Sequence, residues 1–133
     1  MFCSNSFSCV IMNTLIWNCW GALSPSFCNN IKDMVRIHSH SHSLAIMIIM
    51  ETKVCGDRAR WIVDRLPMDG AIIANSIGLL DGLWLLWDSN QVEVIELSST
   101  EQEIHAAVSF SSKPPWLLLA IYGSPRFAER CLL

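Results

Sequence analysis

The sequence lacks an excess of basic residues. Lysine and arginine together number 9 against 12 aspartates and glutamates, which gives a formal net charge of −3. Affinity for nucleic acid depends largely on clustered lysine and arginine, so this balance excludes a general electrostatic attraction to DNA or RNA. Charged residues are 16% of the chain and hydrophobic residues 52%, which argues against disorder over most of its length. Any contact with nucleic acid must therefore be made by a local site on a folded domain.

The six cysteines lack the spacing of a metal-binding or redox motif. They form no CxxC pair and show no zinc-like spacing with histidine. We interpret most of them as reduced thiols that pack as small hydrophobic side chains. The alternative is a small secreted protein with disulfides, and a count of free thiols would distinguish the two.

Long apolar runs and targeting signals are also missing. No stretch approaches the roughly 18 apolar residues of a membrane-spanning helix. The first residues, MFCSNSFSCVI, lack the positive start and long apolar core of a signal peptide. We therefore expect an intracellular protein, in the nucleus or cytoplasm, without membrane association. We predict a disordered leader over residues 1–11 and one domain over residues 12–133.

The first half of the chain alternates strand and helix patterns. The run at 12–17 is apolar and β-prone, and a serine–proline pair then supplies an N-cap and first-turn proline for a helix over 25–37. The residues at 44–50 are all apolar, as in a strand covered on both faces. A second helix is predicted to follow Gly56 and to end before Pro67. This order predicts an α/β layer.

The second half has a different rhythm. Short apolar or alternating runs follow one another closely, separated by turn residues such as Asp-Gly, Ser-Asn and Lys-Pro-Pro. This spacing, with no helix pattern in between, is typical of antiparallel strands joined by hairpins. We predict strands over 71–74, 83–87, 92–97, 106–110 and 116–122.

Asn18 and Glu51 each follow an apolar strand. Their separation of about 33 residues suits one crossover between neighbouring parallel strands. Both side chains would then emerge at one edge of the sheet, where α/β folds place ligand sites. A carboxylate there is a natural ligand for Mg²⁺, which offsets phosphate charge and helps to activate water. The pattern alone also allows a bland interpretation, because such a glutamate is usually a solvated charge and asparagine before a glycine turn is common.

Histidine and tryptophan patterns have simple interpretations. His38, His40 and His42 alternate with serines and are interpreted as a solvated loop, because no cysteine or carboxylate joins them at ligand spacing. Trp84 is predicted to be a core residue of a buried strand. Trp61 stands beside several arginines on the second helix, and we favour an exposed helix face over a stacking platform for bases.

Several motifs resemble those of a known family. The run LIWNCWGA at 15–22 resembles the "WNCRG" motif of endonuclease domains from plant non-LTR (LINE-type) retrotransposons, members of the exonuclease–endonuclease–phosphatase superfamily. The run IMETK at 49–53 resembles their "METK" motif at the expected distance. GLWLLW at 82–87 resembles "GGLALLW", and IYGSP at 121–125 resembles "FYGxP". The order of these motifs makes the resemblance specific, although none of them would suffice alone.

The resemblance implies a fold, a reaction and site residues. The expected fold is a partial four-layer α/β sandwich, deoxyribonuclease-like, in which two mixed sheets pack together with helices outside. The implied reaction is hydrolysis of DNA phosphodiester bonds with Mg²⁺ (or Mn²⁺), by a domain whose parent polyprotein also carries a reverse transcriptase. Glu51 matches the metal-binding glutamate, and Asn18 matches the asparagine that helps to hold the metal and phosphate. Tyr122 matches a tyrosine near the nucleic-acid-binding face. Lys53 would support Glu51 through a charge-assisted hydrogen bond.

The chain also departs from the family pattern. Trp20 replaces the usual arginine, which removes a cation near the phosphate path. The later motifs "GDFN" and "SDH", which supply further acidic and amide groups and the general base, are absent, and His105 does not replace them. We therefore expect an N-terminal part of the domain, truncated before its C-terminal half, with uncovered apolar surface.

The missing groups affect the expected activity. Without the base and the second acidic cluster, metal affinity and rate should fall by orders of magnitude. The alternative is a non-catalytic α/β remnant that acts as a binding module or is the product of a pseudogene.

Overall fold

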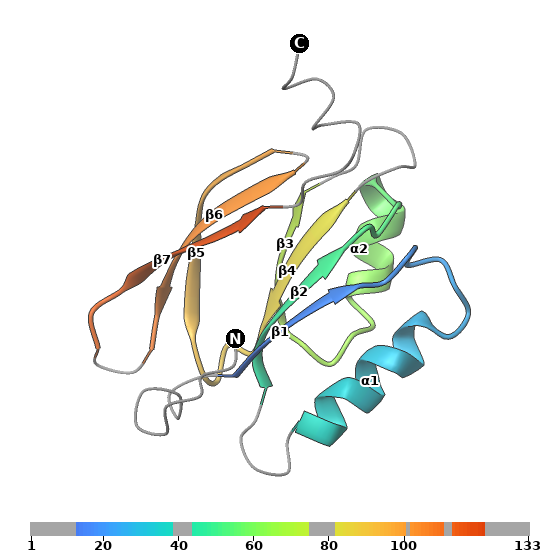
Figure 1. Cartoon of the computed structure of the whole chain (residues 1–133), viewed down its shortest axis with the longest axis horizontal. Coiled ribbons are helices and arrows are strands. Elements are labelled where there is room, and N and C mark those ends of the chain that lie inside the picture. Colours follow the sequence, from blue (N-terminus) through green and yellow to red (C-terminus); the bar gives the residue numbers. More distant parts are fainter. Residues whose placement is uncertain (1–12, 39–43, 75–81, 101, 111–112, 122–133) are drawn as a thin grey trace.

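A four-stranded mixed sheet organises the molecule (Figure 1). The computed structural model describes residues 13–38, 44–74, 82–100, 102–110 and 113–121. The strands of this sheet are β1 (Asn13–Asn18), β2 (Leu44–Met50), β3 (Gly70–Ala74) and β4 (Leu83–Trp87), arranged in the order β1-β2-β4-β3. β1 and β2 are parallel, whereas β4 is antiparallel to both of its neighbours. The predicted crossover between two parallel strands is therefore present.

Two helices cover one side of this sheet (Figure 1). α1 (Phe27–His38) connects β1 to β2, and α2 (Gly56–Val63) connects β2 to β3. The ring of Phe27 stacks on Trp17 with centroids 5.7 Å apart, and its edge meets Trp84 at 5.9 Å. Trp84 is fully buried, as predicted. These aromatic contacts fix α1 against the sheet.

A three-stranded antiparallel sheet covers the other side of the four-stranded sheet (Figure 1). It consists of β5 (Glu93–Ser99), β6 (Glu103–Ser109) and β7 (Trp116–Ile121), paired in chain order. The predicted antiparallel neighbours are confirmed for β3–β4 and for β5–β6–β7, whereas the chain passes from one sheet to the other between β4 and β5. Ile104 and Val108 of β6 are fully buried in the core between the two sheets.

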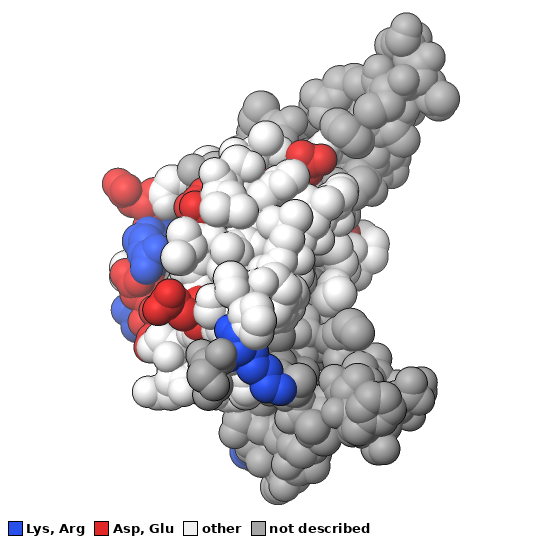
Figure 2. Space-filling model, turned by 90° about the vertical axis from the view of Figure 1, so that its left-hand side faces the viewer, with Lys and Arg blue, Asp and Glu red and all other residues white. Residues whose placement is uncertain are grey.

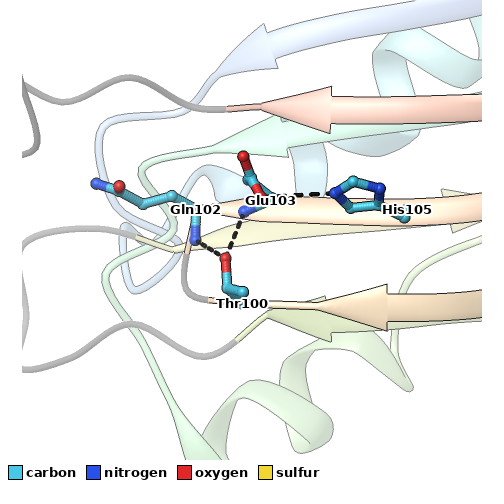
Figure 3. Close-up of polar contacts among 4 residues, drawn as sticks. All are labelled: Thr100, Gln102, Glu103 and His105. Atoms are coloured by element: carbon cyan, nitrogen blue, oxygen red, sulfur yellow. Dashed lines mark hydrogen bonds and ion pairs between the residues drawn. The ribbon is translucent and has the colours of Figure 1, made fainter. Parts of the chain in front are cut away.

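The connection from β5 to β6 is held by Thr100 (Figure 3). Its hydroxyl accepts hydrogen bonds from the backbone N–H groups of Gln102 at 3.3 Å and Glu103 at 3.2 Å. The Thr100 N–H in turn donates to the carbonyl of Glu103 at 2.8 Å. His105 pairs with the Glu103 carboxylate at 3.5 Å on the same strand. Because the buried residues of β6 alternate with it, His105 faces away from the four-stranded sheet.

The structure corrects several predicted bounds. α1 begins two residues later than predicted, because the Ser24 carbonyl accepts the N–H of Phe27 at 3.0 Å and the Ser24 hydroxyl bonds the Ser26 hydroxyl instead of capping the helix. α2 ends at Val63, since the following residues form tight turns that carry the chain to Pro67. β5 begins one residue later and ends two residues later than predicted, whereas β6 begins three residues earlier and ends one residue earlier.

Some predictions fall on parts of the chain that the structure does not describe. The leader at 1–11, Tyr122, and the histidines at 40 and 42 all lie outside the described residues. Within the described residues, neither helix is long and apolar enough to cross a membrane. Cys19, Cys28 and Cys55 carry free thiols.

Candidate functional site

The ends of β1 and β2 lie side by side at one edge of the four-stranded sheet. Asn18, the last residue of β1, is paired in register with Met50, the last residue of β2. Glu51 is the next residue, so the structure brings Asn18 and Glu51 to the same edge. The Cys19 N–H donates to the Met50 carbonyl at 3.0 Å, and the Ala22 N–H donates to the Thr52 carbonyl at 2.8 Å. The two loops therefore stay bonded to each other after the strands have ended.

Both loops contain residues with left-handed backbone conformation. Trp20, Glu51 and Lys53 each have φ of 57°, which is uncommon for residues other than glycine. Each such residue costs about 1–2 kcal/mol relative to a right-handed conformation. Backbone strain of this kind collects at functional sites, where the surrounding structure holds it in place. Its concentration in the loops beside Asn18 supports the choice of this edge as the candidate site.

The Asn18 side chain shapes the first loop. Its Oδ1 accepts a hydrogen bond from the backbone N–H of Trp20 at 3.2 Å, which closes an Asx turn. The amide nitrogen of Asn18 has no acceptor among the described residues. Its N–H groups are therefore available to donate to an anionic ligand.

Glu51 offers a carboxylate at the start of the second loop. The residue is half-buried, and none of the described residues donates a hydrogen bond or forms an ion pair with its carboxylate. Its backbone carbonyl accepts the Cys19 thiol at 3.6 Å. Burial, with a smaller contribution from the Glu51 charge, raises the pKa of Cys19 to about 11. Cys19 therefore stays a neutral thiol at pH 7 and links the two loops without adding charge.

Lys53 lies beside Trp20. The Lys53 ammonium is 6.0 Å from the centroid of the Trp20 ring. No ion pair in the described part of the chain joins Lys53 to Glu51, so the expected charge-assisted hydrogen bond is not part of this structure. Lys53 has a left-handed backbone conformation, and its side chain lies toward Trp20 in the first loop instead of toward Glu51.

Gly82 packs against the second loop at Thr52 and Lys53, a role that the sequence did not reveal. Its carbonyl accepts the Thr52 N–H at 3.5 Å, and its φ of 137° favours glycine. A Cβ at this position would overlap the Thr52 hydroxyl and lie 3.1 Å from the backbone nitrogen of Lys53. The signal in the sequence was a glycine directly before a buried apolar strand, where close backbone approach is common.

An open pocket of about 480 Å³ lies next to the paired loops. Its lining residues are Trp20, Gly21, Leu23, Ser24, Thr52 and Lys53. Within the described ranges, no three histidine, cysteine, aspartate or glutamate side chains gather closely enough to hold a metal ion together. Glu51 is therefore a candidate metal ligand without two further such side chains close to it among the described residues. Tyr122, the predicted substrate contact, lies outside the described residues.

The fold is similar to that of a solved nuclease. No protein-family profile matches the sequence. No curated protein matches it either. The crystal structure of AP endonuclease LMAP from Leishmania major superposes with a TM-score of 0.60 at 12% sequence identity, over 85% of this chain and 40% of that one. The chain thus spans less than half the length of this neighbour. At this level of identity the likeness shows the fold, and the chain therefore has part of the deoxyribonuclease-like α/β sandwich of an AP endonuclease.

Proposed function

We propose that this chain is part of a Mg²⁺-dependent endonuclease domain of LINE-type retrotransposon origin, whose reaction is the hydrolysis of DNA phosphodiester bonds. The observation that carries the proposal is the placement of Asn18 and Glu51 at the same edge of the sheet, where the paired strands β1 and β2 end. The nuclease fold and the order of the sequence motifs support it. The parent polyprotein would also contain a reverse transcriptase, to which this domain would supply cut DNA.

The donor set fits a weakly held hard cation. Mg²⁺ prefers oxygen ligands, keeps several waters and commonly takes one or two protein carboxylates. Glu51 provides one carboxylate, with no competing partner among the described residues. When bound, Mg²⁺ (or Mn²⁺) would offset the negative charge of the phosphate and lower the pKa of a water molecule bound to it.

The residues of the chain have separable roles in this proposal. Glu51 would hold the metal, and the Asn18 amide nitrogen would donate a hydrogen bond to a phosphate oxygen. The Asx turn keeps the Asn18 amide oriented, because its oxygen is already engaged with the Trp20 N–H. Lys53 would add positive charge near the phosphate. Tyr122 would contact the nucleic acid.

A non-catalytic remnant is the second candidate function. It is favoured because no group of three or more histidine, cysteine, aspartate or glutamate side chains among the described residues could hold a metal ion. His105, the histidine placed on a strand, faces away from the four-stranded sheet and pairs with Glu103. In this case the chain would bind DNA or another ligand without cutting it.

Plasmid cleavage distinguishes the two. The purified chain is incubated with supercoiled plasmid in Mg²⁺, beside Glu51→Gln, which removes the charge but keeps the shape. We expect the nicking rate to fall by about 100-fold or more in this variant. Mutation of a residue that only hydrogen-bonds to a metal ligand already lowers metal affinity or activity by about 10- to 100-fold, and loss of the ligand itself should cost more. The matched control is Glu93→Gln, which changes an exposed carboxylate on the three-stranded sheet and should leave nicking unchanged.

Metal binding provides an independent readout. Titration with Mn²⁺ followed by electron paramagnetic resonance should show weaker binding by Glu51→Gln than by the wild type and Glu93→Gln. Wild-type nicking no faster than that of Glu51→Gln would favour the non-catalytic remnant.

A further inference from the structure

Trp20 presents an aromatic ring to solvent at the edge of the candidate site. It is 73% exposed, the highest value among the large hydrophobic side chains that the structure describes. Single exposed apolar residues are ordinary, but the backbone that carries this ring is held in place. The Asn18 side chain accepts the Trp20 N–H, and the next residue, Gly21, has φ of 111°, which only glycine readily adopts. The ring is therefore presented by an ordered loop.

The surroundings of the ring suit a nucleotide. Trp20 and Lys53 line the same pocket, together with Leu23. The Lys53 ammonium, 6.0 Å from the ring centroid, is at the outer limit of a cation–π contact. Sites for single-stranded nucleic acid combine an aromatic surface for the base with a cation for the backbone phosphate. Trp20 and Lys53 provide this combination on the loops that carry Asn18 and Glu51.

Trp61 on α2 provides a comparison within the same chain. It is 59% exposed and also has a cation beside it. There the Arg65 guanidinium lies 3.8 Å from the ring centroid, so one face of the indole is already covered. Trp61 does not line the pocket beside Asn18 and Glu51. Among the residues that the structure describes, an exposed tryptophan beside a cation is thus present at two places, and the ring at Trp20 is the more open one.

We propose that Trp20 and Lys53 form a stacking site for an unpaired nucleobase, so that the chain prefers DNA with single-stranded or extrahelical nucleotides over an intact duplex. Bases within a duplex are already stacked and gain nothing from Trp20 unless they are extruded. The formal net charge of −3 provides no general attraction to a duplex that would mask this preference. The proposal rests on the proposed function for the class of ligand, and it names which form of DNA that site accepts.

Binding without cleavage tests the proposal. Fluorescence anisotropy of a labelled single-stranded 15-mer and of its blunt duplex is measured with the full chain in EDTA. We expect tighter binding of the single strand. Trp20→Ala should weaken single-strand binding about tenfold, within the range found for one base–aromatic stack, and change duplex binding less than about twofold. Trp61→Ala is the matched control and should leave both affinities unchanged.

The variants also separate stacking from folding. Trp20→Phe keeps an aromatic ring and should retain most of the single-strand affinity, while circular dichroism should show that each variant is folded. Equal loss on both DNA forms, no loss in Trp20→Ala, the same loss in Trp61→Ala, or no DNA binding by the wild type would overturn the proposal.

The result is also distinguishable from that of the cleavage test. Trp20-dependent binding of single strands by Glu51→Gln, with no nicking by the wild type, would sustain the stacking site and remove the endonuclease. Metal-dependent nicking with affinity independent of Trp20 would sustain the endonuclease and remove the stacking site.

Discussion

The two sheets contain similar apolar runs in very different surroundings. β2 reads LAIMIIM, and its first six residues are buried because helices cover one face of the sheet and the three-stranded sheet covers the other. β7 reads WLLLAI, yet Ala120 is its only buried residue. The outer face of the three-stranded sheet, seen in Figure 2, has a broad uncharged centre, and the acidic and basic side chains lie around its margin, most of them along one side. The large exposed hydrophobic residues of β5 and β7 are Ile95, Leu97, Trp116, Leu117, Leu119 and Ile121.

The difference shows what an apolar run does and does not predict. A run without alternation predicts a strand whose two faces are both suited to burial. Whether both faces are buried depends on layers supplied elsewhere in the structure. The described residues build three layers of the four-layer sandwich: the helices, the four-stranded sheet and the three-stranded sheet. A contiguous exposed apolar face, such as the outer face of the three-stranded sheet, is typical of a surface that contacts another part of a protein or a partner.

The largest expected effect lies in the four-stranded sheet. Trp84→Ala removes a fully buried ring that meets Phe27 edge to face. We expect a loss of about 3–5 kcal/mol in the free energy of unfolding. Leu119→Ala, on an exposed residue of β7, should cost less than about 0.5 kcal/mol. Urea unfolding followed by circular dichroism measures both. Similar losses in the two variants would remove the contrast between the sheets.

A glycine beneath the candidate site gives the next largest effect. In Gly82→Ala the new methyl group would overlap the Thr52 hydroxyl, and the φ of 137° would be strained. Gly56→Ala is the matched control, because its φ of 64° is also positive but its Cβ would meet nothing within 4 Å. We expect Gly82→Ala to lose about 1–3 kcal/mol more than Gly56→Ala in the free energy of unfolding, since overpacking adds to backbone strain. Equal losses would show that Thr52 moves aside freely.

Much of the fold could be predicted from the sequence, because a strand that is buried on both faces consists almost entirely of apolar residues. β2 and β4 were predicted with both ends placed correctly, since each is an apolar run bounded by polar or turn residues. The start of α1 was wrong by two residues. Ser24 and Pro25 form a turn of their own before the helix, and two serine hydroxyls bond each other where a cap was expected.

The candidate site could be predicted only in part. The placement of Asn18 and Glu51 at one edge of the sheet followed from the spacing of two strands and the crossover between them. The contact between Lys53 and Trp20 could not be predicted, because it depends on left-handed backbone at Glu51 and Lys53. Glutamate and lysine do not favour a left-handed backbone, so their residue types do not predict this conformation. In a residue other than glycine it is set by the packing around the residue.

The smallest expected effect lies on the outer face of the three-stranded sheet. Leu117→Thr changes a residue that is 62% exposed, so the free energy of unfolding in urea should change by less than about 0.5 kcal/mol. Val108→Thr, on the neighbouring strand but facing the core, should cost about 1–3 kcal/mol, because it buries a hydroxyl where Val108 is fully enclosed. A loss at Leu117 as large as that at Val108 would mean that residues beyond the described ones cover this face. The two sheets would then be buried alike.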